Sequence, residues 1–331
     1  MTSMEVTLIT NAILSCTTFL FTSSILGMFI KKRDTIFTRL SNRLLCSMLL
    51  CDQLKSIMLI FHSAIEWFSE TLSRPGCHSC LVFAIMVDVM TSFLTKVFVL
   101  HLCAMVYERY VAVTRALKFN QIFTSKFVKR LLVSVWIIPA LASIIQLVYL
   151  YPYLLWKPEK ASTFEWIAIF DIVYALLAFM GFTLIPSLAI SISFVLILNE
   201  IRSIERKGKT NKFVSRSSPV LKRSIHNTFG NGSYTMKRYQ RKVATAFVMR
   251  SRHRAAICLF VIFVSFVILS FPYFLLRLYV DLMMWQENEV TLSPVVFDVV
   301  YTMKNVTLLL NALIYILMNR EVRDKTVAFL F

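Results

Sequence analysis

The sequence is poor in glycine and in charged residues. Only 6 of its 331 residues are glycine and 16% are Asp, Glu, Lys or Arg, whereas 57% are hydrophobic. One soluble domain could not bury that much apolar surface, so the composition excludes an ordinary soluble globular protein. The mean hydropathy of +0.68 agrees with this and predicts an integral membrane protein.

Motifs of the common enzyme classes are also missing. The sequence has no His-Glu-x-x-His, no Gly-x-Ser-x-Gly and no phosphate-cradling glycine loop, so we expect no enzyme activity. The five histidines lie in different segments, at His62, His78, His101, His226 and His253. A channel or transporter that uses intramembrane charges is a less favoured alternative, because transporters usually show repeated halves and helices broken by Gly or Pro.

Long apolar runs indicate how the chain crosses the membrane. A helix needs about 20 residues to cross about 30 Å of hydrocarbon. Seven runs qualify, near 7–30, 43–67, 80–108, 131–153, 166–199, 255–280 and 293–318. The first has no basic leader and no clear small-residue cleavage site, so we expect it to remain as a spanning helix. The prediction is an all-α membrane protein, with residues 1–331 forming a single domain of seven transmembrane helices.

The distribution of Lys and Arg predicts the orientation. The segments 31–43, 109–130, 200–254 and 320–331 hold 5, 6, 15 and 3 of them, which is 29 of the 36 in the chain. Because cytosolic loops carry the excess of basic residues, the N-terminus is predicted outside and the C-terminus inside. The net charge of +18 is then explained by topology and by attraction to anionic lipid headgroups, and no nucleic-acid partner is expected.

Cysteine is scarce at the predicted extracellular mouth. The seven cysteines are Cys16, Cys46, Cys51, Cys77, Cys80, Cys103 and Cys258. Only Cys77 and Cys80 lie near that mouth, where they either bridge each other or stay reduced. A Cys-x-x-Cys pair without a further Cys or His cluster is weak evidence for zinc, and we predict no metal site.

The segment 200–254 is the only long connection. It is rich in Lys, Arg and Ser and contains Gly230-Asn231-Gly232, a turn-forming sequence. We predict a basic cytosolic loop that is largely disordered in its middle, with serines available to kinases. A short amphipathic helix is predicted in the cytosolic tail at 319–331.

Several short motifs lie at consistent spacings in these runs. Glu108-Arg109-Tyr110 closes the third run, and its simplest explanation is a charged pair at the membrane edge. The other motifs are Asn42 and Asp52 in the second run, Trp136 in the fourth, Pro186 in the fifth, Phe266 and Pro272 in the sixth, and Asn311-Ala312-Leu313-Ile314-Tyr315 in the seventh. Together they resemble the rhodopsin-like (class A) G protein-coupled receptors over nearly the whole chain.

The resemblance implies a two-state switch. An extracellular ligand would favour outward movement of the sixth helix, and a heterotrimeric G protein would bind the opened cavity in the plasma membrane, with arrestin and kinases as further partners. The residues that it assigns to coupling and switching are Glu108, Arg109, Tyr110, Leu117, Asn311, Tyr315, Phe266, Pro272 and Asp52.

Three departures from the family pattern qualify this. Arg252 stands where many members place an acid that pairs with the arginine of the third helix, so we predict that Glu108 alone restrains Arg109 and that basal signalling is measurable. Phe98, Thr307 and Ser270 replace the usual Ser, Asn and Trp near the second-helix Asp, so the family's sodium site is incomplete, and Asp52 is expected to pair with Asn311 or water. Most members of the family have a disulfide between the top of the third helix and the loop after the fourth. That disulfide cannot form here, because no cysteine lies between the fourth and fifth runs.

Polar residues in the outer half of the bundle are the candidate ligand contacts. They are Lys55, Asp88, Thr91, Lys96, Tyr273, Arg277, Tyr301 and Lys304. The set is unusually cationic and indicates either an anionic small molecule or peptide C-terminus, or internal pairing of Asp88 with Lys304 or Lys96. The resemblance argues against an amine ligand, because Thr91 replaces the acid with which amine receptors bind the ligand ammonium.

A retinal-binding opsin is the main alternative. Lys304 lies in the seventh run and could form a Schiff base with retinal, which would then be the one cofactor. In opsins, however, the lysine precedes the Asn by six residues, whereas Lys304 precedes Asn311 by seven. One residue turns a side chain by about 100° around a helix. We therefore expect no cofactor.

Overall fold

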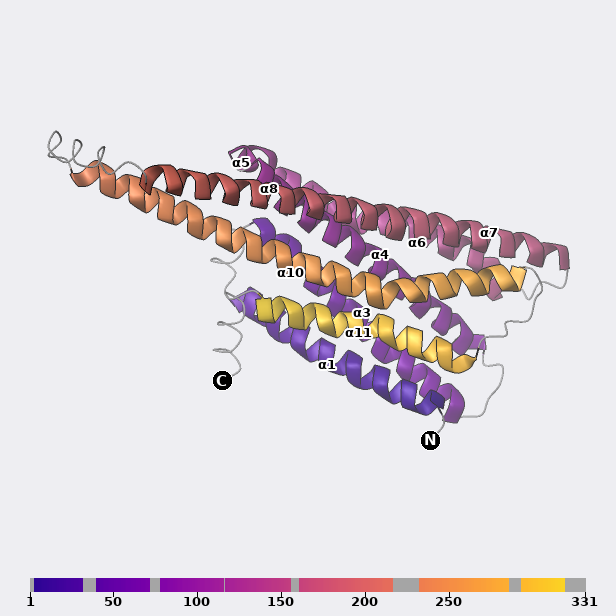
Figure 1. The fold of residues 1–331 in the computed structure, drawn as a ribbon. Helices are drawn as coiled ribbons and strands as arrows, with labels where there is room; N and C mark the ends of the chain where they lie inside the picture. Colours follow the sequence, from indigo (N-terminus) through magenta and orange to yellow (C-terminus); the bar gives the residue numbers. More distant parts are fainter. Residues whose placement is uncertain are drawn as a thin grey trace.

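The computed structural model describes residues 3–31, 40–71, 78–115, 117–155, 161–216, 232–285 and 293–318. These residues form helices and short turns, with no strand among them. The helices are α1 (Ser3–Lys31), α3 (Leu40–Thr71), α4 (His78–Thr114), α5 (Phe119–Ile122), α6 (Ser125–Leu155), α7 (Ala161–Phe179), η1 (Met180–Leu184), α8 (Ile185–Arg216), α10 (Gly232–Trp285) and α11 (Pro294–Met318). They lie side by side as an elongated bundle (Figure 1).

Within the described residues, seven helical segments are long and apolar enough to cross a membrane. They are Glu5–Lys31, Asn42–Ile65, Ile85–Thr114, Ser125–Val148, Ile172–Ser203, Ala256–Val280 and Val295–Ile314. On α6, the large apolar side chains of Leu141, Ile144, Ile145 and Val148 are all exposed, which suits contact with lipid. The predicted seven-helix, all-α membrane architecture is confirmed, while the orientation of the termini stays a prediction.

Helix α4 is the centre of the bundle. In its most apolar stretch 72% of the residues are buried, a larger share than in any of the other six spans. It packs against α3 and α6 on one side and α8 and α10 on the other. Leu94, Val97 and Leu102 are almost completely enclosed and belong to the main apolar core. Any polar side chain that α4 turns inward therefore meets several other helices.

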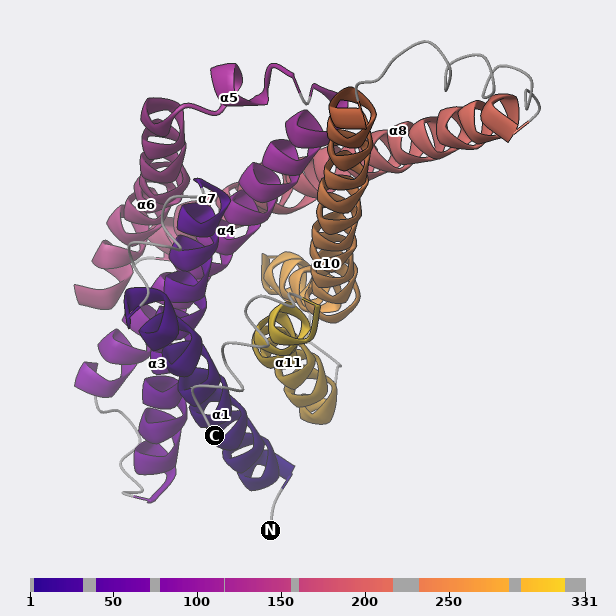
Figure 2. The same cartoon turned by 90° about the vertical axis from the view of Figure 1, so that its left-hand side faces the viewer.

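Polar contacts join α1 to its two neighbours. Helix α11 lies between α1 and α10 when the bundle is viewed along its length (Figure 2). Asn305 Nδ2 on α11 donates to Asn11 Oδ1 on α1 at 3.1 Å, and both residues are buried. Gln53 Nε2 on α3 donates to Ser23 Oγ on α1 at 2.8 Å. Such bonds help to hold membrane helices together, because lipid is as apolar as the helix surfaces and gives no hydrophobic driving force for their association.

A second polar cluster joins α3, α4 and α6. The Ser47 hydroxyl oxygen lies 2.8 Å from His101 Nε2 and accepts a hydrogen bond of 2.9 Å from Trp136 Nε1. His101 Nδ1 lies 2.9 Å from the Val97 carbonyl of its own helix. Since His101 is fully buried, this serine satisfies two ring nitrogens in a place that water does not reach.

The fifth span is one continuous helix interrupted by a π-helical turn. Helix α7 passes through η1 into α8, and Pro186 follows just after η1. Proline lacks the N–H that an α-helix needs and its ring clashes with the carbonyl four residues earlier, so a wider turn before it relieves both problems. The extra residue rotates the preceding side chains around the helix axis and buries Thr183.

Helix α10 is far longer than a membrane requires. Its 54 residues extend about 80 Å, against about 30 Å of hydrocarbon, and Pro272 lies inside it. Together with the end of α8 it projects beyond the other helices (Figure 1). The segment 200–254, predicted as a loop, is thus helical at both ends, because Lys, Arg, Met and Ala are good helix formers. Its middle, 217–231, and the predicted tail helix at 319–331 lie outside the described residues.

Candidate functional site

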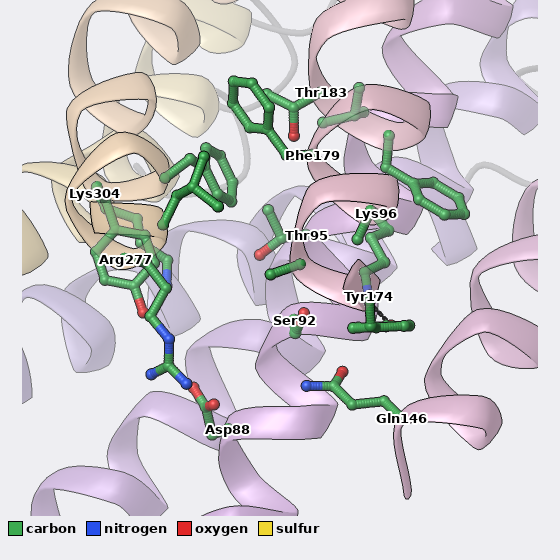
Figure 3. A pocket seen from close by; sticks show the side chains of 17 residues that line it. Asp88, Ser92, Thr95, Lys96, Gln146, Tyr174, Phe179, Thr183, Arg277 and Lys304 are labelled. Atoms are coloured by element: carbon green, nitrogen blue, oxygen red, sulfur yellow. Dashed lines mark hydrogen bonds between the residues drawn. The ribbon is translucent and has the colours of Figure 1, made fainter. Parts of the chain in front are cut away.

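A cavity of about 120 Å³ opens between the helices in the predicted outer half of the bundle. Its lining comes from α4, α6, α7, η1, α10 and α11. The residues are Asp88, Ser92, Thr95, Lys96, Val99, Gln146, Tyr174, Ala175, Ala178, Phe179, Phe182, Thr183, Tyr273, Phe274, Arg277, Leu278 and Lys304. We call this space the main cavity (Figure 3).

The charges of the main cavity are mostly positive. Lys96, Arg277 and Lys304 reach it from three different helices, and among the described residues that line it Asp88 is the one acid. Figure 3 shows the Arg277 guanidinium extending toward the Asp88 carboxylate, away from the two lysines. The lysines are buried, at 6% exposure for Lys96 and 5% for Lys304. The deeper part of the cavity therefore presents two ammonium groups.

Lys96 is held by the fifth span. Its Nζ donates to the Tyr174 hydroxyl at 2.6 Å, and that hydroxyl donates in turn to the Ala142 carbonyl at 3.0 Å. The same ammonium lies 5.0 Å from the centre of the Tyr174 ring and 5.9 Å from that of Phe182. Aromatic faces attract cations, but they leave the charge of the lysine uncompensated.

Lys304 sits over two tyrosine rings. Its Nζ is 3.6 Å from the centre of the Tyr273 ring and 5.3 Å from that of Tyr301. The two rings are 5.9 Å apart, so tyrosines of α10 and α11 form one aromatic wall behind this lysine. The contact holds the ammonium against the Tyr273 ring, which also lines the main cavity.

The internal pairing considered from the sequence is not found. Among the described residues, neither Lys96 nor Lys304 has a carboxylate within 4.0 Å, and Asp88 acts on both only over a longer range. The reason is depth, because Asp88 is exposed and lies eight residues, or about 12 Å, before Lys96 on α4. The acid is at the rim and the lysines are inside.

A second cavity, of about 220 Å³, adjoins the first. It lies between α1, α3, α10 and α11, and Tyr273 and Arg277 line both cavities. Tyr301 lines the second one and stacks near His62, with ring centres 5.8 Å apart. The two cavities are thus separated by side chains of α10.

The predicted ligand contacts divide into two groups. Asp88, Lys96, Tyr273, Arg277 and Lys304 line the main cavity, and Tyr301 lines the second one. Thr91 and Lys55 are buried but line neither of these cavities. Sequence reasoning missed Gln146, Tyr174, Phe179, Phe182 and Thr183. The last four lie before Pro186, in a part of the fifth span where the π-helical turn decides the direction of each side chain.

Asp52 on α3 is 1% exposed and lines neither of the two cavities. Neither of its carboxylate oxygens has a hydrogen-bond partner in the described structure, and Asn311 Oδ1 has none either. The expected pairing of Asp52 with Asn311 is therefore absent. Ser270 and Thr307 instead bond to each other at 3.2 Å, which ties α10 to α11 at positions that departed from the family pattern.

Phe266 and Pro272 lie between the cavity and the basic end of α10. The Phe266 ring is 5.7 Å from Phe98 on α4 and 6.4 Å from Phe274, which lines the main cavity. An aromatic chain thus runs from the cavity into the core. This chain of rings is present although Ser270, at the position of the family's usual Trp, provides no aromatic ring.

At the basic end, Arg109 Nε lies 3.1 Å from Glu108 Oε2, and Glu108 is nearly buried. The contact expected between these neighbours is present. Arg109 also interacts electrostatically with Cys258 on α10, whose Sγ lies 4.0 Å from the Ile314 carbonyl on α11. Tyr110 packs against the core and Leu117 is 99% exposed.

Some predicted positions lie outside the described residues. Cys77 is one of them, and nothing is described of the side chains of Cys80, Arg252 and Tyr315, although these three positions are helical. In the described ranges, no group of three His, Cys, Asp or Glu side chains gathers as a metal site.

Comparison with known proteins agrees with this architecture. The model of the family described as 7 transmembrane receptor (rhodopsin family) matches residues 24–315, which is most of the chain. No curated protein matches the sequence.

Proposed function

The chain belongs to the rhodopsin family of seven-transmembrane receptors, and from this premise we propose that it signals through heterotrimeric G proteins at the plasma membrane in response to an anionic ligand. The observation that carries the ligand class is the main cavity, where Lys96 and Lys304 point inward without a carboxylate partner among the described residues. A bound carboxylate or phosphate would supply the missing negative charge and form charge-assisted hydrogen bonds.

The lining narrows the ligand further. It contains the apolar rings of Phe179, Phe182 and Phe274 together with the ammonium groups of Lys96 and Lys304. This pattern suits a small molecule or peptide terminus that joins an apolar body to one anionic group. Gln146 and Ser92 offer uncharged hydrogen-bonding groups at the side of the cavity.

Helix α10 connects the cavity to the coupling end. Tyr273, Phe274 and Arg277 lie just after Pro272 and line the cavity, and Cys258 lies near Arg109 at the other end of the span. A ligand that draws the cavity end of α10 inward would favour a tilt of the rest of this helix. Since ligand and G protein would then favour the same state, each would raise the affinity for the other.

We propose that the G protein contacts the basic end of the bundle. Arg109 and the exposed Leu117 lie there on or directly after α4. The basic ends of α8 and α10 lie at the same, predicted cytosolic end of the bundle. Arrestin and kinases are the further partners that we propose there.

The test is G protein nucleotide exchange with the purified receptor and a panel of carboxylates, phosphates and short peptides. Wild type should respond to an anionic compound. Lys96→Met and Lys304→Met should each raise the half-maximal concentration by about tenfold or more, because each loses an interaction with a charged group. Lys129→Met, at an exposed lysine of α6 that lines neither cavity and is not adjacent to Arg109 or Leu117, is the matched control.

Three other outcomes would contradict this proposal. A response to amines that Lys304→Met leaves unchanged would exclude the anionic class. An absorbance band in the visible range after incubation with retinal, lost in Lys304→Met, would favour an opsin. Ion flux in liposomes without any nucleotide exchange would favour a channel or transporter.

A further inference from the structure

The second cavity has an acid in its wall. Asp298 lies on α11, one turn before Tyr301, and both side chains line this cavity of about 220 Å³. In the part of the chain that the structure describes, the Asp298 carboxylate has no hydrogen bond, and no Lys, Arg or His nitrogen lies within 4.0 Å of it. The side chain is half-buried. It therefore brings an uncompensated negative charge to a space that is open to a ligand.

Aromatic rings form much of the same wall. The centre of the Tyr301 ring is 5.8 Å from that of His62 on α3 and 5.9 Å from that of Tyr273 on α10. Phe297, the neighbour of Asp298 on α11, is also in the lining. Ring faces attract ammonium groups, and a carboxylate beside them adds a charge-assisted hydrogen bond. The second cavity is thus built for a cation, whereas the main cavity is built for an anion.

Arg277 is the residue that stands between these two environments. It lines both cavities, and its guanidinium extends toward Asp88 at the rim of the main cavity (Figure 3). None of its nitrogens lies within 4.0 Å of the Asp298 carboxylate. Because the Arg277 side chain is exposed, it moves without opening the packed core. An extended molecule can therefore reach from one cavity into the other by displacing this one side chain.

The spacing of the charges indicates the length of such a molecule. Asp298 and Lys304 are six residues apart on α11, which is about 9 Å along the helix axis. A single α-amino acid is too short, because its ammonium and carboxylate are attached to the same carbon. An extended peptide spans at most about 3.3–3.6 Å per residue, so about three residues cover this distance. The cavity volumes of about 120 and 220 Å³ together reach the lower end of the range for small-ligand pockets.

We propose that the ligand is a zwitterion with the length of about three peptide residues. Its ammonium group binds Asp298 and the rings of the second cavity, while its carboxylate binds the lysines of the main cavity. This inference rests on the anionic ligand class proposed above and adds a positive group at the other end of the molecule. A carboxylate that lacks the amine fills only the main cavity and binds more weakly.

The test uses a library of tripeptides of alanine, leucine and phenylalanine, each with free termini, with an acetylated N-terminus or with an amidated C-terminus. Binding to the purified full-length receptor is measured as the rise in Tm, because a ligand that binds the folded state stabilises it by mass action. For the peptide that binds best, acetylation should raise the half-saturating concentration by about tenfold or more, since it removes the charge that meets Asp298. Amidation should weaken binding to a similar extent.

Variants of the acid locate the amine. Asp298→Asn should bind the free and acetylated peptides about equally, while Asp298→Glu should keep the preference for the free form. Glu5→Gln is the matched control, because Glu5 is a half-buried acid at the same end of the bundle that lines neither cavity. It should keep the preference of wild type. If Asp298→Asn does not fold, Tyr301→Leu replaces it and should reduce the preference, and the wild-type comparison still decides.

The outcomes separate this inference from the anionic ligand class. Equal binding of free and acetylated peptides, with weaker binding of amidated ones, would overturn the zwitterion and support the anion. A preference for the free form that persists in Asp298→Asn, or that disappears in Glu5→Gln, would also overturn it. If no tripeptide binds, the zwitterion fails, and the panel of carboxylates and phosphates still decides the anionic class. Equal binding of free and amidated peptides would contradict both.

Discussion

Arg109 Nε and Glu108 Oε2 are 3.1 Å apart, and the two residues are neighbours on the same helix. A contact within α4 does not hold α10 in place. Packing also joins the sixth span to its neighbours, including Phe194 of the fifth span against Phe260 and Phe263.

Basal signalling should be measurable as a result. Position 252 is an arginine, so it cannot supply the acid that many members of the family place there opposite the arginine of the third helix. We expect second-messenger levels in cells expressing wild type to exceed those with Arg109→Ala at equal surface expression. Equal levels for the two would contradict the argument.

Replacing Glu108 with glutamine should raise basal signalling. Glu108→Gln removes the negative charge from a buried position, so the Arg109 side chain loses its attraction to this neighbour on α4. We expect basal nucleotide exchange on G protein to rise by about two- to fivefold, which corresponds to a loss of about 0.4–1 kcal/mol of restraint. Glu5→Gln, at the opposite end of the bundle, serves as the control. A fall in exchange, with folding intact, would assign Glu108 to the active state instead.

The Ser47 cluster should matter for stability and not for ligand chemistry. Ser47→Ala leaves nitrogens of both His101 and Trp136 without their partner in the core, and each unsatisfied buried group costs about 1–3 kcal/mol. We expect a lower Tm of the purified receptor. Ser24→Ala is matched, since Ser24 is half-buried like Ser47 and its described bond goes to the Leu20 carbonyl of its own helix. The same Tm for the two variants would refute the role of the cluster.

The asparagine pair between α1 and α11 should show direct coupling. Asn11→Ala, Asn305→Ala and the double variant form a thermodynamic cycle around the 3.1 Å bond. The coupling free energy should be about 0.6 kcal/mol and at most about 1.7, the range of interhelical hydrogen bonds in membranes. Additive losses of stability would show that the two side chains act separately.

The helices could be predicted because the membrane imposes their length. Seven apolar runs gave seven spans, and a polar residue in such a run, such as Lys96 or Lys304, stood out as a candidate for the cavity. The ends of helices were less predictable. The basic stretches next to 217–231 resemble a loop by composition, yet their residues favour helix once α8 and α10 are nucleated by packing in the membrane.

The rest of the cavity could not be predicted for a geometric reason. Tyr174, Phe179 and Phe182 are ordinary residues for a membrane helix, and only the π-helical turn decides which of them point inward. The direction of these side chains depends on one extra residue in the turn, and the spacing of apolar residues in the sequence does not show that extra residue. That Asp88 forms no ion pair with Lys96 or Lys304 likewise depends on its depth along α4, which composition does not contain.

The length of α10 turns a small angle into a large displacement. From Pro272 to Gly232 the helix continues for 40 residues, or about 60 Å, so a rotation of about 10° at the proline would move its far end by about 10 Å. The helix is a lever with its pivot beside the cavity. A fluorescent label near Gly232 would therefore amplify conformational changes that are barely visible at the ligand itself.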